Sequence, residues 1–140
     1  MFWGASSANN LQKIFILQKR AIRYISNKKK TEHCKNLFQE LNLLTVPSIY
    51  IYEIISNNLK SLKNENSHKY YTRKNYSYQE HHRLKLFEKK PIFAAKKLYS
   101  HLPKYVRNKP ENEFKNKLKR WLINKAFYSL QEFYEGEEEK

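Results

Sequence analysis

Apolar residues recur at helical spacing near the start of the chain, between Asn9 and Lys30. Residues three and four positions apart share one face of a helix, and the basic residues of this segment fall on the other face. Asn9 with Gln12 fits an N-terminal capping pair, and the lysines at 28–30 suit the negative end of the helix dipole. The pattern predicts an amphipathic helix with a core-facing stripe. That stripe comprises Leu11, Ile14, Phe15, Gln18, Ala21, Ile22 and Ile25.

Two more helices are predicted before residue 64. A short one covers 33–41, and Pro47 opens a longer one because its fixed φ suits the first turn of a helix. The run 49–52 is β-branched and aromatic, so a strand is the alternative there, but the length of the periodic segment favours a helix. The inward residues of the short helix are Cys34, Leu37, Phe38 and Leu41. Those of the longer helix are Tyr52, Ile55, Leu59 and Leu62, widened by Ile51 and Ile54.

The helical period disappears between residues 64 and 90 and then returns. A short helix is predicted after Pro91, and Pro110 opens a long final helix with Phe114, Leu118, Trp121 and Leu122 on its inner face. Ser129 with Glu132 forms a capping box for a small terminal helix. The expected fold is mainly α: one helical domain at 1–134 with about five helices, a short β-hairpin as the option for 70–87, and an acidic tail at 135–140.

Composition adds a strong positive charge to this helical pattern. The 140 residues include 28 Lys and Arg against 13 acidic residues, and every acidic residue is a glutamate. A surface of this kind binds phosphate backbones through counterion release. The abundant Lys, Asn, Ile, Tyr and Phe also fit an AT-rich coding sequence, so mutational bias is the competing explanation of the charge.

The residue types argue against catalysis and against a metal site. Enzymes that process nucleic acid with paired metal ions mostly hold those ions with aspartates, which this chain lacks. Cys34 is the only cysteine, and the five histidines are scattered, so we expect no metal and no cofactor. We assign no catalytic residue. Without a signal peptide or a long apolar run, the expected location is intracellular, in the nucleus or the cytoplasm, with no membrane contact.

Nucleic acid is the expected partner, and two kinds of residue suggest where it binds. Between Tyr70 and Tyr78 aromatic residues alternate with cations, which suits base stacking beside phosphate contacts. A tyrosine-rich strand packed on the helices explains that stretch equally well. The predicted contact residues are Lys13, Lys19, Arg20, Arg23, Tyr71, Arg73, Lys74, Lys115, Lys119 and Arg120.

Several short segments together resemble the C-terminal region of reverse transcriptases (RNA-directed DNA polymerases) from non-LTR retrotransposons, in particular the jockey-like branch. They match, in order, the family motifs W-G, L-Q-x-x-A-I-R, Y-x-T-R or N-T-R, L-W-N-x-L-P, F-K-x-x-L-K and F-Y-S-x-x-E-F. The matching segments are Trp3-Gly4, Leu17–Arg23, Tyr71–Arg73, Leu98–Pro103, Phe114–Lys119 and Phe127–Phe133.

The resemblance spans nearly the whole chain, with some departures. Tyr99 and Ser100 stand where the family shows Trp and Asn. The family's catalytic palm and endonuclease, and the cysteine-rich knuckle of some relatives, have no counterpart here. The resemblance thus implies a non-catalytic fragment of this mobile-element enzyme that grips RNA or DNA and, in an intact element, adjoins an upstream polymerase domain. A free nucleic-acid-binding module and a non-functional fragment are the alternatives; oligomeric state is left open.

Overall fold

The computed structural model describes residues 8–64 and 90–136 of the chain. These residues are mainly helical, which confirms the predicted fold class. The helices are α1 (Ala8–Ile25), α2 (Lys35–Glu40), α3 (Val46–Asn64), α5 (Pro91–Ser100), α6 (Lys104–Arg107), α7 (Glu111–Lys125) and α8 (Leu130–Glu135).

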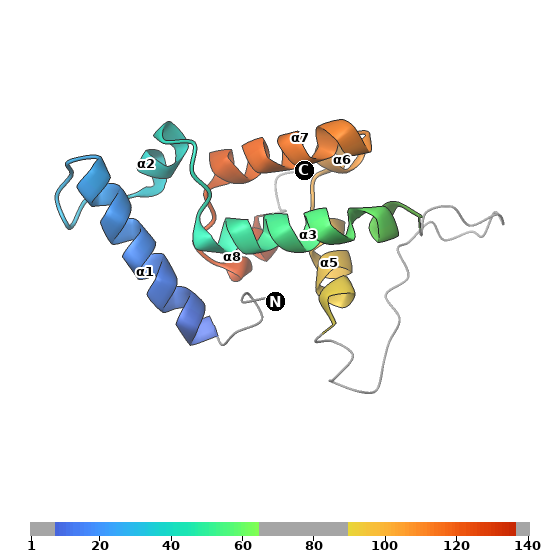
Figure 1. Cartoon of the computed structure of the whole chain (residues 1–140), viewed down its shortest axis with the longest axis horizontal. Coiled ribbons are helices and arrows are strands. Elements are labelled where there is room, and N and C mark those ends of the chain that lie inside the picture. Colours follow the sequence, from blue (N-terminus) through green and yellow to red (C-terminus); the bar gives the residue numbers. More distant parts are fainter. Residues whose placement is uncertain (1–7, 65–89, 137–140) are drawn as a thin grey trace.

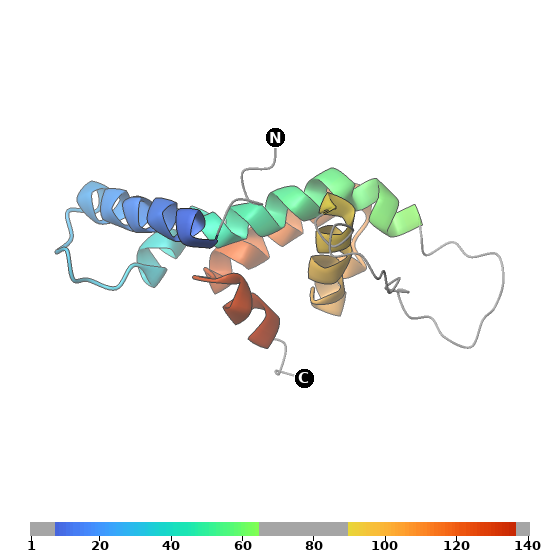
Figure 2. The same ribbon diagram turned by 90° about the horizontal axis from the view of Figure 1, so that it is seen from below.

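The long helix α3 is the central element of the fold. In Figure 1 it runs between α7 on one side and α5 and α8 on the other, while α1 and α2 occupy one end of the molecule. Seen from below, in Figure 2, the same helices form an elongated body with α1 at its tip. The run 49–52 lies inside α3, so its β-branched residues are helical and the strand alternative is wrong.

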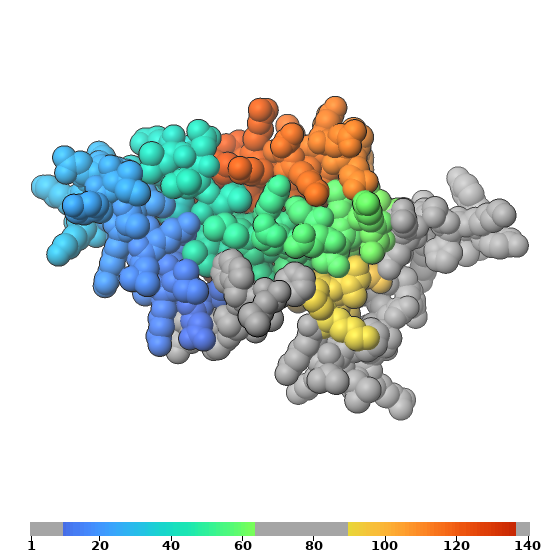
Figure 3. Space-filling model, viewed as in Figure 1, coloured from blue at the N-terminus to red at the C-terminus, as the bar shows by residue number. Residues whose placement is uncertain are grey.

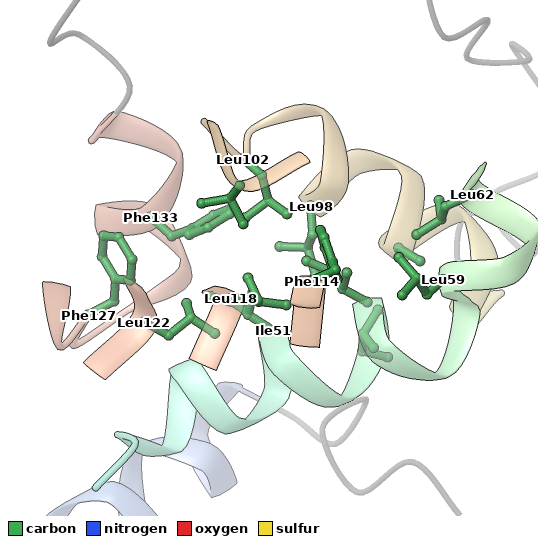
Figure 4. Packing of buried hydrophobic residues seen from close by; sticks show 14 residues of the cluster. Ile51, Leu59, Leu62, Leu98, Leu102, Phe114, Leu118, Leu122, Phe127 and Phe133 are labelled. Atoms are coloured by element: carbon green, nitrogen blue, oxygen red, sulfur yellow. The ribbon is translucent and has the colours of Figure 1, made fainter. Parts of the chain in front are cut away.

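Most buried side chains belong to one cluster, which we call the main core. Figure 4 shows its residues converging from α3, α5, α7 and α8. It comprises Ile51, Ile54, Ile55, Leu59, Leu62, Ala95, Leu98, Leu102, Val106, Phe114, Leu118, Leu122, Phe127 and Phe133. Burying such side chains contributes about 1.5–3 kcal/mol each, so this cluster is the principal source of stability. The inner stripes predicted for α3 and α7 lie here, with Tyr52 and Trp121 packed at its edge.

A second, smaller cluster joins α1 and α2 to the start of α3. We call it the small core; it consists of Phe15, Ile22, Cys34, Leu37, Phe38, Val46 and Ala126. The ring of Tyr128 closes it, edge-on to Phe15 at 5.1 Å between centroids. This pairing brings the chain that leaves α7 onto the helix that begins the fold.

Four predicted core positions in the first two helices are wrong. The sequence stripe placed Ile14, Ala21 and Ile25 inward, yet all three are exposed on α1. The small core covers only the line through Phe15 and Ile22, because α1 packs at the end of the body and meets few partners. Leu41, predicted to point inward from α2, is 39% exposed because the helix has ended at Glu40.

The remaining differences concern short elements. The described residues contain seven helices and not about five; the short helices α2 and α8 correspond to the predicted ones at 33–41 and after Ser129. The four-residue helix α6 had no predicted counterpart. The hairpin proposed for 70–87 lies outside the described residues, as does most of the acidic tail.

Candidate nucleic-acid interface

Two of the four α1 residues predicted to bind phosphate are engaged within the fold. The Nζ of Lys19 lies 4.6 Å from the ring centroid of Phe15 and 5.3 Å from that of Tyr128. The Nε of Arg23 donates a hydrogen bond of 2.8 Å to the backbone carbonyl of Glu32. Cations over aromatic rings and charged donors on carbonyls stabilise a fold, so these two side chains help to hold α1 in place.

The other two α1 cations, Lys13 and Arg20, are exposed. They are seven residues apart and therefore lie on one side of the helix, away from Phe15 and Ile22. This pair is accessible to an anion.

The three predicted cations of α7 do not share one flank. Lys115 and Lys119 are four residues apart and lie together, whereas Arg120 falls on the other flank, near Lys117. All four are exposed. The buried side of the helix, with Phe114, Leu118 and Leu122, lies between these two flanks and belongs to the main core.

The predicted contacts Tyr71, Arg73 and Lys74 lie outside the described residues, together with the whole Tyr70–Tyr78 stretch. They remain predictions.

One residue that the sequence did not single out, Tyr105, adds an aromatic ring to the cations of α7. It lies on α6 with 55% of its side chain exposed. The Nζ of Lys117 is 5.6 Å from its ring centroid. An exposed ring with a cation at its face is the arrangement on which a nucleic-acid base stacks while its phosphate is neutralised.

Lys117, which approaches this ring, also lines a depression in the surface. Its volume is about 260 Å³, and it is lined by Lys109, Glu113, Asn116, Lys117 and Arg120. Lys109 and Glu113 form an exposed ion pair of 3.4 Å. The remaining two cations have no acidic partner among the lining residues, so the depression carries a net positive charge and suits a phosphate group.

The corner between α6 and α7 is fixed by local geometry and by α3. Pro103 and Pro110, both extended, precede the two helices, and the fully buried Val106 anchors the short one. Lys63 of α3 donates a hydrogen bond of 2.7 Å to the carbonyl of Lys109, and its Nζ lies 5.3 Å from the Phe114 ring centroid. These contacts hold the depression against the main core.

Behind this corner, the phenol of Tyr99 is half-buried between α5 and α6. Burial raises the pKa of Tyr99, and the nearby charge of Arg107 partly lowers it. The hydroxyl donates to the carbonyl of Arg107 at 3.4 Å, a long hydrogen bond. Tyr99 therefore supports α6 as a neutral side chain and does not present its ring to solvent as Tyr105 does.

The two basic sets lie on separate parts of the molecule. Figure 1 shows α1 and α7 with α2 between their ends, and Figure 3 shows the α6–α7 surface on the far side of α2 and α3 from α1. The predicted contacts therefore do not form one continuous patch. Within the described residues, the α6–α7 set combines cations with an exposed ring and a depression, and we call it the α6–α7 face. It consists of Tyr105, Lys109, Glu113, Asn116, Lys117 and Arg120.

The α6–α7 face could have been found only in part from sequence. In Lys104-Tyr105-Val106-Arg107, an aromatic residue sits beside cations between two prolines, which is a local signal of exposure. The approach of Lys117 to the Tyr105 ring depends on the turn between α6 and α7, and the spacing of residues along the sequence does not predict the geometry of that turn.

Cys34 is buried and does not line this face. Its thiol lies 3.8 Å from the carbonyl of Lys19 and 3.7 Å from that of Glu32, within the small core. Within 8–64 and 90–136, no three His, Cys, Asp or Glu side chains gather as a metal site. Among those same residues, no helix is long and apolar enough to cross a membrane.

Comparison of the chain with protein-family models, with curated proteins and with solved structures gives no match.

Proposed function

We propose that this chain binds nucleic acid through its α6–α7 face, gripping the sugar-phosphate backbone without reading bases, and that it performs no catalysis itself. The observation that carries the proposal is the exposed ring of Tyr105 with the Nζ of Lys117 5.6 Å from its centroid, beside a cationic depression. Phosphates would lie on Lys117 and Arg120, and a base would stack on the ring. A stacking platform favours a single strand, because the bases of a duplex are already stacked.

The chain as a whole supports this proposal through its charge. Formal net charge is +15, and the body before the acidic tail is more positive still, since five of the 13 acidic residues lie at 132–139. Long-range attraction of a polyanion follows from this balance, while the α6–α7 face supplies the short-range contacts.

We further propose that the chain derives from the C-terminal region of a retrotransposon reverse transcriptase. The support is the ordered set of motifs, most of whose apolar members in the described part are core residues, although Leu17 and Ala21 of the motif in α1 are exposed. Leu98 and Leu102 come from one motif, Phe114 and Leu118 from the next, and Phe133 from the last, and all are buried in the main core. The resemblance therefore concerns packing positions more than a ligand site, so it supports a shared fold more directly than a shared ligand.

A charge-matched pair of double variants tests the binding face. Lys117→Gln with Arg120→Gln removes two positive charges from the α6–α7 face, and Lys13→Gln with Arg20→Gln removes two from α1. Fluorescence anisotropy with a labelled single-stranded oligonucleotide at low salt should show a loss of about tenfold or more for the first pair, as two charge-assisted contacts imply. The second pair should lose much less.

Equal losses for the two pairs would mean that total charge governs binding, and the α6–α7 face would then have no special role. Absence of binding by the unchanged protein at low salt would remove the proposed function itself. A cooperative thermal melt of each variant, followed by circular dichroism, shows that the comparison is made on folded protein.

A further inference from the structure

Helix α1 leaves a line of apolar side chains uncovered. Phe15 and Ile22 are 2% exposed, whereas Ile14 is 44% exposed, Leu17 61% and Tyr24 89%. The uncovered residues recur at intervals of three and four, as one face of a helix does. We call this line the α1 outer stripe; it consists of Ile14, Leu17, Ala21, Tyr24 and Ile25.

The outer stripe lies beside the packed face of α1 and not opposite to it. At 3.6 residues per turn its centre is rotated by about 120° from the line of Phe15 and Ile22. Gln18 marks the boundary between the two, because its amide donates to the carbonyl of Leu44 at 2.8 Å and accepts from the N–H of Val46 at 2.9 Å. The stripe therefore borders the connection from α2 to α3.

That connection is itself partly apolar. Leu41 is 39% exposed and Leu43 is 41% exposed. Apolar side chains are therefore exposed on this connection as well as on the outer stripe. An apolar line of this spacing on one helix is a surface onto which a second amphipathic helix can pack its own apolar face.

The charge around the stripe selects the kind of helix that fits. Between Ala8 and Ile25 there is no acidic residue and there are four basic ones. Lys13 and Arg20 are exposed and follow the edge of the stripe that faces away from Gln18. A second copy of α1 laid on this surface would bring like charges together, which is unfavourable. The complementary partner carries carboxylates beside its apolar line.

We infer that the α1 outer stripe is a docking surface for an acidic amphipathic helix of a partner protein. The apolar face of that helix covers Leu17 and Tyr24, and its glutamates or aspartates pair with Lys13 and Arg20. From Ile14 to Ile25 the stripe spans three turns, or about 16 Å, which is the length engaged by helices that dock through anchors at i, i+3, i+4 and i+7.

The experiment uses the full 140-residue chain and a synthetic probe. The probe is a labelled helical peptide of about four turns with leucines along one face and glutamates elsewhere, and its control carries lysines in place of the glutamates. Binding is measured by fluorescence anisotropy. Leu17→Asn with Tyr24→Asn should weaken binding about tenfold or more, since interface anchors carry most of the binding energy. Lys115→Gln, on another helix, should change binding little.

The charge requirement is tested with the double variant Lys13→Glu, Arg20→Glu. This variant should bind the acidic peptide more weakly, and the lysine peptide more strongly, than the unchanged protein does. Both stripe variants change exposed side chains, and circular dichroism confirms that they stay helical. If the acidic peptide does not bind, or if the lysine peptide binds equally well to the unchanged protein, the inference is wrong.

Three other occupants give distinct results, each of which overturns the inference. Binding to phosphatidylserine vesicles that is lost in the Leu17→Asn, Tyr24→Asn variant, with no binding of the peptide, assigns the stripe to a membrane. Dimerisation in analytical ultracentrifugation that the same variant abolishes assigns it to a second copy. Peptide binding that appears only after deletion of residues 1–7 means that the chain covers its own stripe.

Discussion

The hydroxyl of Thr45 donates a hydrogen bond of 2.6 Å to the backbone carbonyl of Phe127, although the two residues are 82 positions apart. Thr45 is fully buried, and the same hydroxyl accepts from the N–H of Ser48 at 3.3 Å at the start of α3. One side chain therefore caps the central helix and fixes the segment that follows α7. This contact lies where the two hydrophobic clusters meet, since Val46 and Phe127 belong to different clusters.

Replacing Thr45 by valine keeps the shape of the side chain and removes both hydrogen bonds, as well as a third of 2.9 Å between the hydroxyls of Thr45 and Ser48. A buried acceptor left unpaired costs about 1–3 kcal/mol, so the free energy of unfolding should fall by about that amount. Urea denaturation measures the change. Thr31→Val is the matched control, because Thr31 is exposed and should be nearly neutral. An equal effect of the two substitutions would contradict the structural role of Thr45.

Glu132 stabilises the junction between α8 and α2 in two separable ways. One carboxylate oxygen lies 3.1 Å from the Nζ of Lys35, and the other accepts from the N–H of Tyr128 at 2.6 Å. The hydroxyl of Ser129 accepts from the N–H of Glu132 at 3.0 Å, which confirms the first half of the predicted capping box. The carboxylate reaches the residue before the cap and not the cap itself.

Two substitutions at Glu132 separate the ion pair from the backbone contact. Glu132→Gln retains an oxygen for the N–H of Tyr128 and loses only a partly exposed ion pair, which is worth about 0–1 kcal/mol. Glu132→Ala loses both and should destabilise by about 1–2 kcal/mol. Urea titrations at low and high salt check this, since only the ion-pair contribution is screened. The exposed Glu40→Ala should have little effect.

The backbone conformation of Ala126 is one that glycine adopts easily, so we predict that Ala126→Gly changes stability little. Ala126 ends α7 with φ 46° and ψ 56°, the left-handed conformation, and its side chain is 1% exposed. Glycine would relieve about 1–2 kcal/mol of steric cost and lose about 0.8 kcal/mol for the buried methyl, so Ala126→Gly should lie within about 1 kcal/mol of the unchanged protein.

Ala95→Gly provides the comparison, because Ala95 is 0% exposed and lies within α5. There the lost methyl and the poor helix propensity of glycine act together, for a loss of about 2 kcal/mol. Chemical denaturation of both variants tests the difference. If both were destabilised equally, the left-handed end of α7 would not be present in solution.

Strong periodicity and close packing explain which elements could be predicted from sequence. In α3 and α7 the apolar residues meet partners on every side, so Leu59 and Leu118 are buried where the pattern places them. In α1 the pattern is just as regular, yet the predicted inward residues Ile14 and Ile25 are exposed, because an apolar stripe in the sequence does not say how many of its residues neighbouring helices will cover. Tyr105 lies on a helix too short for any period, and its position depends on tertiary packing of Val106.

Alkaline pH should destabilise the fold through half-buried tyrosines. Burial raises the pKa of Tyr50 above its ordinary value of 10.0. The unfolded chain therefore loses this proton at lower pH than the folded chain, and unfolding becomes easier as pH rises. The stabilising contribution is complete below about pH 10 and is lost above it as pH rises through the raised pKa.

Tyr50→Phe removes this titrating group. The free energy of unfolding should therefore decrease less between about pH 8 and about pH 11 than it does in the unchanged protein. Urea unfolding at both pH values measures it, and Tyr24→Phe is the control, because Tyr24 is 89% exposed. A pH dependence unchanged by Tyr50→Phe would mean that this phenol is not buried in the folded protein.

Substitution of Tyr105 should separate base stacking from phosphate attraction at the α6–α7 face. Tyr105→Ala removes the ring and leaves the cations, so affinity for a single strand should fall by about 1–3 kcal/mol, the usual worth of one stacked base. Tyr105→Trp should preserve or raise affinity because it presents a larger ring. The affinity for a duplex of the same sequence should change little with either substitution, since the bases of a duplex are not free to stack on the protein.

The salt dependence of binding distinguishes this ring from its cationic neighbours. Each neutralised phosphate of a single strand contributes about −0.7 to the slope of log affinity against log salt concentration. Lys117→Gln should reduce the steepness by about that amount, whereas Tyr105→Ala should lower affinity at every salt concentration and leave the slope unchanged. Anisotropy titrations over a range of salt measure both quantities. If Tyr105→Ala reduced the slope as much as Lys117→Gln does, the ring would be positioning Lys117 and not receiving a base.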